Sequence, residues 1–122
     1  MSLLSLTFRD RPDGIQVLLA GEIDLSVAGQ LRSALNSALR HTTGVVEVDL
    51  FGVRFLDCTG IGVLGRAWST AAAQGCCLYV SHPQAFVLRV LRLAGMSPLL
   101  AGNAPAAGPD RPPRSALVQI DP

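Results

Sequence analysis

The chain has 122 residues, of which 49% are hydrophobic, and its formal net charge is only +1. These values fit one domain with a substantial core. Its ten basic residues are all arginines and form no basic stripe, which argues against nucleic-acid binding. No apolar run approaches the roughly 18–20 residues that span a bilayer, and residues 1–6 lack the basic start of a secretory signal. We therefore expect a cytoplasmic protein that binds neither nucleic acid nor membrane.

The cysteines and histidines predict neither a disulfide framework nor a metal site. Cys76 and Cys77 are adjacent and Cys58 stands alone, while His41 and His82 have no ligand spacing to each other or to the cysteines. We expect three reduced thiols, with Cys76 and Cys77 packed on the two faces of a strand, and no cofactor.

The first half of the chain predicts a hairpin and a helix. Two apolar runs, 3–8 and 15–20, are joined by a charged turn with Pro, Asp and Gly, which is typical of an antiparallel hairpin. From residue 27 to residue 40 apolar residues recur with a helical period, with Ser26 as the expected N-cap.

The next elements alternate between strands and helices. Residues 45–50 predict a buried strand, and 53–56 are a second brief apolar stretch before a helix over 61–73. Gly62 and Gly65 in that helix indicate that another segment approaches its backbone closely. Residues 76–80 predict a further strand, and His82-Pro83 opens a third helix with one apolar face: Val87, Val90, Leu91 and Ala94. This alternation after a hairpin predicts an α/β fold with a mixed sheet and helices packed against it.

The composition changes after residue 100. Residues 101–122 hold five of the eight prolines, which predicts a flexible tail behind a domain of residues 1–100. An alternative for residues 115–120 is an edge strand, on this molecule or on a neighbour.

Several segments, taken in order, resemble the STAS family. They are Gly21–Ser26, Val48–Leu50, Val53–Leu64 with its Asp57-Cys58-Thr59-Gly60 core, and His82-Pro83 with the helix up to Met96. The resemblance covers about residues 3–100. It implies a STAS-like mixed sheet with an N-terminal antiparallel hairpin.

The resemblance also implies a function, that of an anti-sigma factor antagonist. In such proteins the unphosphorylated form binds an anti-sigma factor of the serine kinase type and frees a sigma factor. Phosphorylation of the first serine after the Asp breaks this complex, and a phosphatase restores it. The antagonist is thus a substrate and a ligand, not an enzyme.

Cys58 stands where the resemblance places the phosphoserine, and Thr59 supplies the neighbouring hydroxyl. Thr59 is therefore the candidate phosphorylation site, with a role as helix cap as the alternative. If Thr59 is not modified, the protein is a constitutive antagonist. For Cys58 the alternatives are a small packing residue and a redox-sensing thiol.

The candidate partner-binding residues lie in the loops before the first two helices. Asp24 and Asp57 are expected to present acidity to the partner, and Gly60 and Gly62 to keep the surface beside the hydroxyl open. The full set is Asp24, Ser26, Asp57, Cys58, Thr59, Gly60, Ile61 and Gly62.

Three other functions compete with this interpretation. The first is a STAS subunit of a larger assembly, such as an ABC lipid-transport or stress-signalling complex. The second, a phosphatase-like enzyme with Cys58 as nucleophile, is disfavoured because the next basic residue, Arg66, lies inside the predicted helix and no histidine is near in sequence. The third, a nucleotide pocket at Gly60-Ile61-Gly62, lacks the acidic residue expected about 20 residues on.

Overall fold

The computed structural model describes residues 3–100, which form one four-stranded sheet and three α-helices. The hairpin consists of β1 (Leu4–Arg11) and β2 (Gly14–Ile23), followed by the 3-10 turn η1 (Leu25–Val27) and α1 (Ala28–Arg40). Next come β3 (Val45–Leu56), α2 (Cys58–Ala73), β4 (Cys77–Ser81), α3 (Ala85–Leu93) and the 3-10 turn η2 (Ser97–Leu99). The predicted tail, including residues 115–120, lies outside the described residues.

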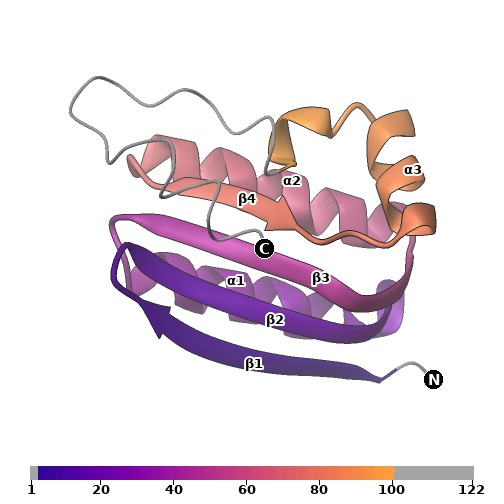
Figure 1. Ribbon diagram of the computed structural model, residues 1–122, viewed down its shortest axis with the longest axis horizontal. Coiled ribbons are helices and arrows are strands. Elements are labelled where there is room, and N and C mark those ends of the chain that lie inside the picture. The colour runs from indigo at the N-terminus through magenta and orange to yellow at the C-terminus, as the bar shows by residue number, and fades with distance from the viewer. Residues whose placement is uncertain (1–2, 101–122) are drawn as a thin grey trace.

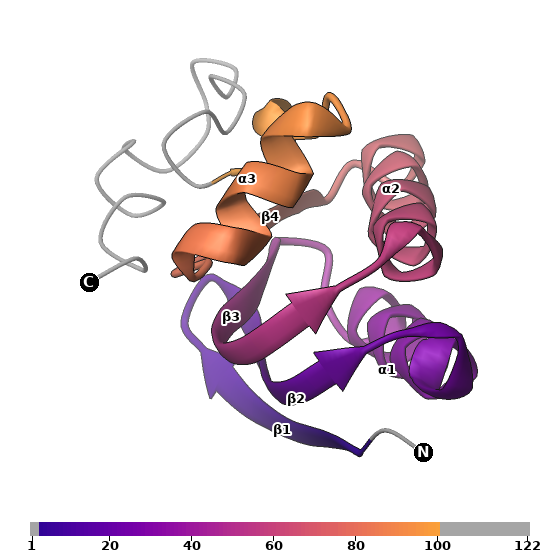
Figure 2. The same cartoon turned by 90° about the vertical axis from the view of Figure 1, so that its right-hand side faces the viewer.

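The strand order is β1-β2-β3-β4 (Figure 1). β1 pairs with β2 antiparallel, and β2–β3 and β3–β4 are parallel. Helices α1 and α2 cover one face of the sheet (Figure 2), and α3 contacts β3. The predicted α/β fold with a mixed sheet and an N-terminal antiparallel hairpin is confirmed.

The core lies between the sheet and helices α1 and α2. Alternate residues of β3 (Val46, Val48 and Leu50) are completely buried together with Leu31 and Leu64 of the two helices. Since side chains alternate across a strand, Glu47 and Asp49 point to the opposite face. The parallel strands β2 and β3 begin so close together that a Cβ on Gly14 would collide with the carbonyl group of Val45.

Some local predictions need correction. Residues 45–50 and 53–56 belong to one strand, because a β-bulge against β2 absorbs Phe51 and lets the strand continue through Gly52. The apolar face of α3 consists of Val87 and Leu91 with the partly buried Leu88, whereas Ala94 lies beyond the helix end and is exposed. Cys76 and Cys77 are buried as expected, although β4 begins at Cys77.

Candidate partner-binding site

Two loops lie side by side at the carboxyl ends of β2 and β3 (Figure 1). The parallel pairing ends with Ile23 opposite Leu56, and the backbone N–H of Asp57 donates to the carbonyl oxygen of Ile23 at 3.1 Å. Each strand then leads directly into a helical segment. The structure therefore brings the two predicted groups, residues 24–26 and 57–62, to the same end of the sheet.

Each loop is held by an aspartate that caps the following helical segment. Asp57 Oδ1 accepts hydrogen bonds from the backbone N–H groups of Thr59 (3.0 Å) and Gly60 (3.1 Å). Asp24 Oδ1 accepts from the backbone N–H (2.9 Å) and from the hydroxyl (2.6 Å) of Ser26. Such bonds satisfy N–H groups that have no partner inside the first turn.

These caps correct two predictions. Ser26 is not the N-cap of the first helix, because the turn η1 is inserted between β2 and α1 and Asp24 caps that turn instead. Thr59 is not a cap either, since it is the second residue of α2 and Asp57 is the N-cap. The alternative in which Thr59 serves only as a helix cap is thereby removed.

The site residues differ in exposure. Cys58, the first residue of α2, is exposed, and Thr59, Ile61 and Gly62 are partly buried. Gly60 is buried, so it does not keep the surface open. A Cβ there would lie 2.5 Å from Leu56 Cδ1 and 2.6 Å from Ile23 Cγ2. The glycine lets the first turn of α2 rest on the ends of β2 and β3.

Gly62 and Gly65 predicted that another segment closely approaches the backbone of α2, and the structure shows such an approach only at Gly65. A Cβ on Gly62 would meet nothing nearer than an Arg66 nitrogen at 3.9 Å, whereas one on Gly65 would lie 3.3 Å from Met96 Cε. Among the glycines of α2 the tightest approach is thus at Gly60, two residues before Gly62.

Sequence reasoning missed an aromatic pair beside the loops. Phe55, two residues before Asp57, stacks on Phe86 of α3 with ring centroids 6.0 Å apart and planes 15° apart. The two residues are 40% and 47% exposed, and Leu25 in the other loop is 75% exposed. The sequence could have indicated an exposed aromatic side chain only at Phe55, because alternation along β3 places it on the face opposite the buried Leu56.

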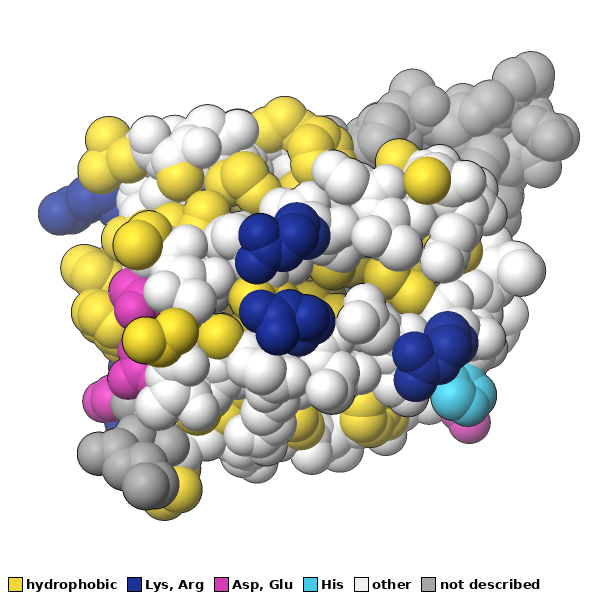
Figure 3. Space-filling view, turned by 180° about the vertical axis from the view of Figure 1, so that it is seen from behind, with side chains coloured by type: hydrophobic (Ala, Val, Ile, Leu, Met, Phe, Trp, Pro, Cys, Tyr) yellow, Lys and Arg dark blue, Asp and Glu magenta, His cyan; other side chains and the backbone are white. Residues whose placement is uncertain are grey.

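Carboxylates accompany these apolar side chains. Glu22, Asp24 and Asp57 all lie at the carboxyl ends of β2 and β3, and the view from behind shows acidic side chains among hydrophobic ones at this edge (Figure 3). Arg54 reaches Glu22 at 3.8 Å, but both side chains are largely exposed, so this pair contributes little. The edge thus combines apolar contact area with negative charge, as an interface for a basic and apolar partner surface would.

A second polar cluster lies on the sheet face that α1 and α2 leave open. Glu47 is 1% exposed, accepts from Arg11 (3.3 Å) and Ser81 (2.5 Å), and lies opposite Gln16 in the β2–β3 register. Burial raises the pKa of Glu47 above its usual value, although the bonds from Ser81 and Gln16 and the charge of Arg11 act in the opposite direction. None of these cluster residues is among the predicted site residues.

In the part of the chain that the structure describes, no helix is long and apolar enough to cross a membrane.

Comparison with known proteins found a matching family model, curated relatives and solved structures. The family model described as "Mlab, STAS domain" matches residues 6–101. An anti-sigma-B factor antagonist of Listeria monocytogenes is 26% identical over 98 residues, covering 80% of this chain and 86% of that protein.

Solved structures agree on the fold. An anti-sigma factor antagonist from Mycobacterium paratuberculosis superposes with a TM-score of 0.72 at 19% identity, covering 97% of this chain and 93% of the other. The anti-sigma factor antagonist SpoIIAA matches in its unphosphorylated form (TM-score 0.66, 20% identity, 95% and 96% covered). SpoIIAA of Bacillus also matches in its phosphorylated form (TM-score 0.63, 17% identity, 95% and 99% covered). With a family model that spans most of its length, the chain belongs to the STAS domain family.

Proposed function

We propose that this protein is an anti-sigma factor antagonist, which binds an anti-sigma factor of the serine kinase type in the cytoplasm and so releases a sigma factor. The supporting observation is the pair of loops at the carboxyl ends of β2 and β3, where exposed Cys58 and partly exposed Thr59 stand beside Asp24 and Asp57. The names of the Listeria relative and of the SpoIIAA structures support the same role.

The two loops suit a docking surface because hydrogen bonds within the domain already hold their turns. Asp24 and Asp57 fix the turns through their hydrogen bonds, and the Asp57–Ile23 bond fixes one loop against the other. Preorganisation of this kind lowers the ordering cost of association. The residues that contact the partner are Asp24, Ser26, Asp57, Cys58, Thr59, Gly60, Ile61 and Gly62, with buried Gly60 contributing through the shape of the turn.

Regulation by phosphorylation takes one of two forms. In the first, the kinase modifies Thr59, adding a charge of about −1.5 to −2 next to the carboxylates of Asp57 and Asp24. The N-terminus of α2 tolerates an anion, so the modification repels the partner rather than unfolding the domain. A phosphatase then restores binding. In the second form, Cys58 in place of the usual serine leaves the protein a constitutive antagonist.

The binding test uses the purified full chain and each serine-kinase anti-sigma factor of the source organism. The proposal expects a stable complex whose formation displaces the cognate sigma factor. An Asp24→Lys, Asp57→Lys double variant should lose the complex, and a variant with Arg9→Glu at the distant β1 edge should keep it. If the wild-type chain binds none of these proteins, it is not an antagonist.

Incubation with the cognate kinase and ATP, followed by intact-mass measurement, separates the two forms of regulation. If Thr59 is the acceptor, the wild-type chain gains one phosphate and Thr59→Ala gains none. A Thr59→Ser, Cys58→Ala double variant, which keeps a hydroxyl at residue 59, is still modified. An unchanged mass supports the constitutive form.

One observation favours a second candidate function. The description of the matching family model, "Mlab, STAS domain", names no anti-sigma factor. The alternative is a STAS subunit of a larger assembly, such as an ABC lipid-transport or stress-signalling complex. Co-purification of the chain with a transporter ATPase, together with failure to bind any anti-sigma factor, would favour this alternative.

A further inference from the structure

Three potential metal ligands converge on the open face of the sheet. Glu47 and Asp49 are two residues apart on β3 and share a face, and His82 follows the last residue of β4. One ligand atom from each of the three lies within 4.8 Å of the other two. Imidazole nitrogen and carboxylate oxygen are both ordinary ligands of Zn²⁺.

The distance between Asp49 and His82 fits a shared cation. His82 Nδ1 lies 3.5 Å from Asp49 Oδ2. Two ligands on a tetrahedral zinc, with bonds of about 2.0–2.2 Å, stand roughly 3.3–3.6 Å apart. The remaining oxygen of Asp49, Oδ1, accepts from the backbone N–H of Phe51 at 2.8 Å, which fixes the carboxylate within the β-bulge.

Two buried polar atoms at this cluster lack hydrogen bonds. The residue Gln16 is 5% exposed, contacts Glu47 with its side chain, and has no partner for Oε1 among the described residues. His82 Nδ1 is buried as well and, despite its ion-pair distance to Asp49, makes no hydrogen bond. Buried polar groups are normally satisfied, so the unpaired Gln16 oxygen, beside a His82 Nδ1 that makes no hydrogen bond, is what a missing electropositive partner would leave.

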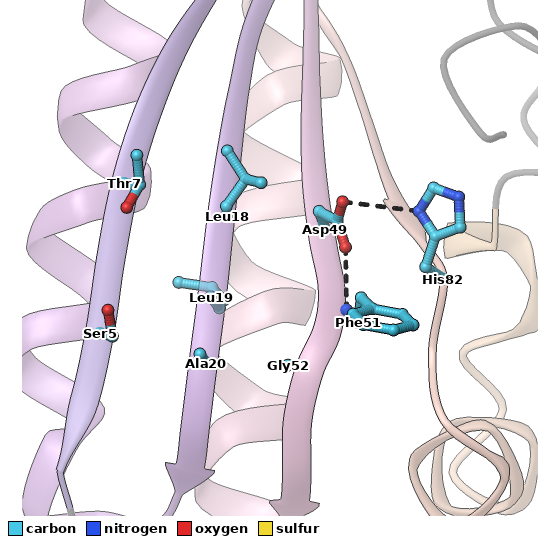
Figure 4. Close-up of a pocket in the computed structure, with 9 residues that line it drawn as sticks. All are labelled: Ser5, Thr7, Leu18, Leu19, Ala20, Asp49, Phe51, Gly52 and His82. Atoms are coloured by element: carbon cyan, nitrogen blue, oxygen red, sulfur yellow. Dashed lines mark hydrogen bonds and ion pairs between the residues drawn. The ribbon is translucent and has the colours of Figure 1, made fainter.

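A pocket gives an ion access to the cluster. Asp49 and His82 form one wall of a cavity of about 490 Å³ on the open sheet face, with β1 and β2 opposite them (Figure 4). Figure 4 shows the Asp49 carboxylate and the His82 ring directed toward each other at this wall. The His82 backbone has a φ of 54°, a left-handed conformation that is uncommon for a residue with a side chain, and it places the ring there.

Arg11 is the competing partner, since it donates to Glu47 at 3.3 Å. A carboxylate offers about four lone-pair sites, and Arg11, Ser81 and Gln16 use three of those on Glu47. One site remains for a cation. With one Arg against two carboxylates, the cluster still keeps an excess negative charge for a divalent ion.

We propose that Glu47, Asp49 and His82 form a binding site for a divalent transition-metal cation of the Zn²⁺ class, open to solvent through the adjoining pocket. Asp49 and His82 are the ligands nearest the pocket, and Glu47 closes the site from the buried side. Water completes the coordination on the pocket side. The site is independent of the partner-binding loops, so its presence does not depend on the proposed function.

The test is titration of the full, tag-free chain with ZnCl₂ by calorimetry, in a Cys58→Ser background that removes the exposed thiol. Asp49→Asn keeps the oxygen that accepts from Phe51 but loses the charge. His82→Asn loses the imidazole and keeps a residue that tolerates a left-handed backbone. Each should weaken Zn²⁺ binding at least about tenfold, as expected for loss of a ligand. His41→Asn, which removes the other, exposed histidine, is the matched control and should bind Zn²⁺ unchanged.

A second measurement needs no substitution at the site. The chain has two histidines, so NMR of the Cys58→Ser protein gives two imidazole signals, which His41→Asn assigns. Zn²⁺ should shift the His82 signal and leave that of His41 in place. The proposal is overturned if the Cys58→Ser chain binds no Zn²⁺, if either site variant binds as well as the control, or if only the His41 signal responds.

Discussion

The backbone N–H of Asp57 donates a hydrogen bond to the carbonyl oxygen of Ile23, 3.1 Å away, and thereby extends the β2–β3 pairing by one residue beyond Leu56, the last residue of β3. The bond has a consequence for the proposed interface. Since Asp57 also caps α2, any displacement of this residue moves the start of the helix and the neighbouring loop together. If the proposed interface is correct, stability and partner binding are therefore coupled at Asp57.

The first prediction concerns the cap itself. Asp57→Ala removes the acceptor for the N–H groups of Thr59 and Gly60 and should lower the free energy of unfolding by about 1 kcal/mol. Asp57→Asn, which retains a capping oxygen, should stay close to wild type. Urea denaturation of the three proteins measures the difference. Equal stabilities of the Ala and Asn variants would contradict the capping role.

Two glycines of α2 provide a matched pair for the second prediction. A Cβ at residue 60 would press on Leu56 and Ile23 at 2.5–2.6 Å, so Gly60→Ala should destabilise the fold by about 1–3 kcal/mol. At Gly62 the space is open, so Gly62→Ala should be neutral or stabilising by up to about 1 kcal/mol, the difference in helix propensity. Thermal or urea unfolding compares them. A harmless Gly60→Ala would show that the first turn of α2 packs less tightly than described.

The fold could be predicted because its signals are local. The polar turn at Pro12–Gly14 and the helical period of residues 28–40 each involve residues within one element, and both appear in the structure as expected. The Asp57–Gly60 segment was expected to precede a helix that begins at Ile61, but only Asp57 does so, because Cys58, Thr59 and Gly60 already belong to the first turn of α2. Its cap was identified less well, because the residue that caps a turn depends on where the chain leaves the strand.

The parts that could not be predicted depend on contacts between distant segments. Phe55 stacks on Phe86, which lies 31 residues further along the chain. Glu47 and Asp49 lie near His82 only because β3 and β4 pair in one particular register. Inspection of the histidines and cysteines alone therefore predicted no metal site. Strand register follows from packing of the whole sheet, which a single sequence does not reveal.

The third prediction separates the cysteines by their accessibility. Cys58 is exposed, whereas Cys76 and Cys77 are buried. Burial, with a smaller contribution from Cys77, also raises the pKa of the Cys76 thiol, so less of the reactive thiolate is present at neutral pH. Iodoacetamide should add one group to the native protein and three in denaturant, counted by intact mass. Cys58→Ser should abolish the native reaction, and fast labelling of all three thiols would mean that β4 opens readily.

The last prediction assigns the aromatic pair to the proposed interface with an anti-sigma factor. Phe86 is half-exposed and stacks on Phe55 beside the Asp57 loop, so its ring is available to fill a pocket on the partner at little cost to the fold. Phe86→Ala should weaken the complex at least about tenfold, or roughly 1.4 kcal/mol, a typical loss for an aromatic residue central to an interface.

Phe8→Ala is the matched control, because Phe8 is 46% exposed against 47% for Phe86 but lies on β1, opposite Val17 and well away from the carboxyl end of β2. Calorimetry or interferometry with the purified partner measures both variants, and circular dichroism checks that each is folded. If both variants bind as wild type does, the anti-sigma factor contacts the capped loops without the aromatic pair; if both lose affinity equally, the loss reflects general destabilisation and the assignment of Phe86 is wrong.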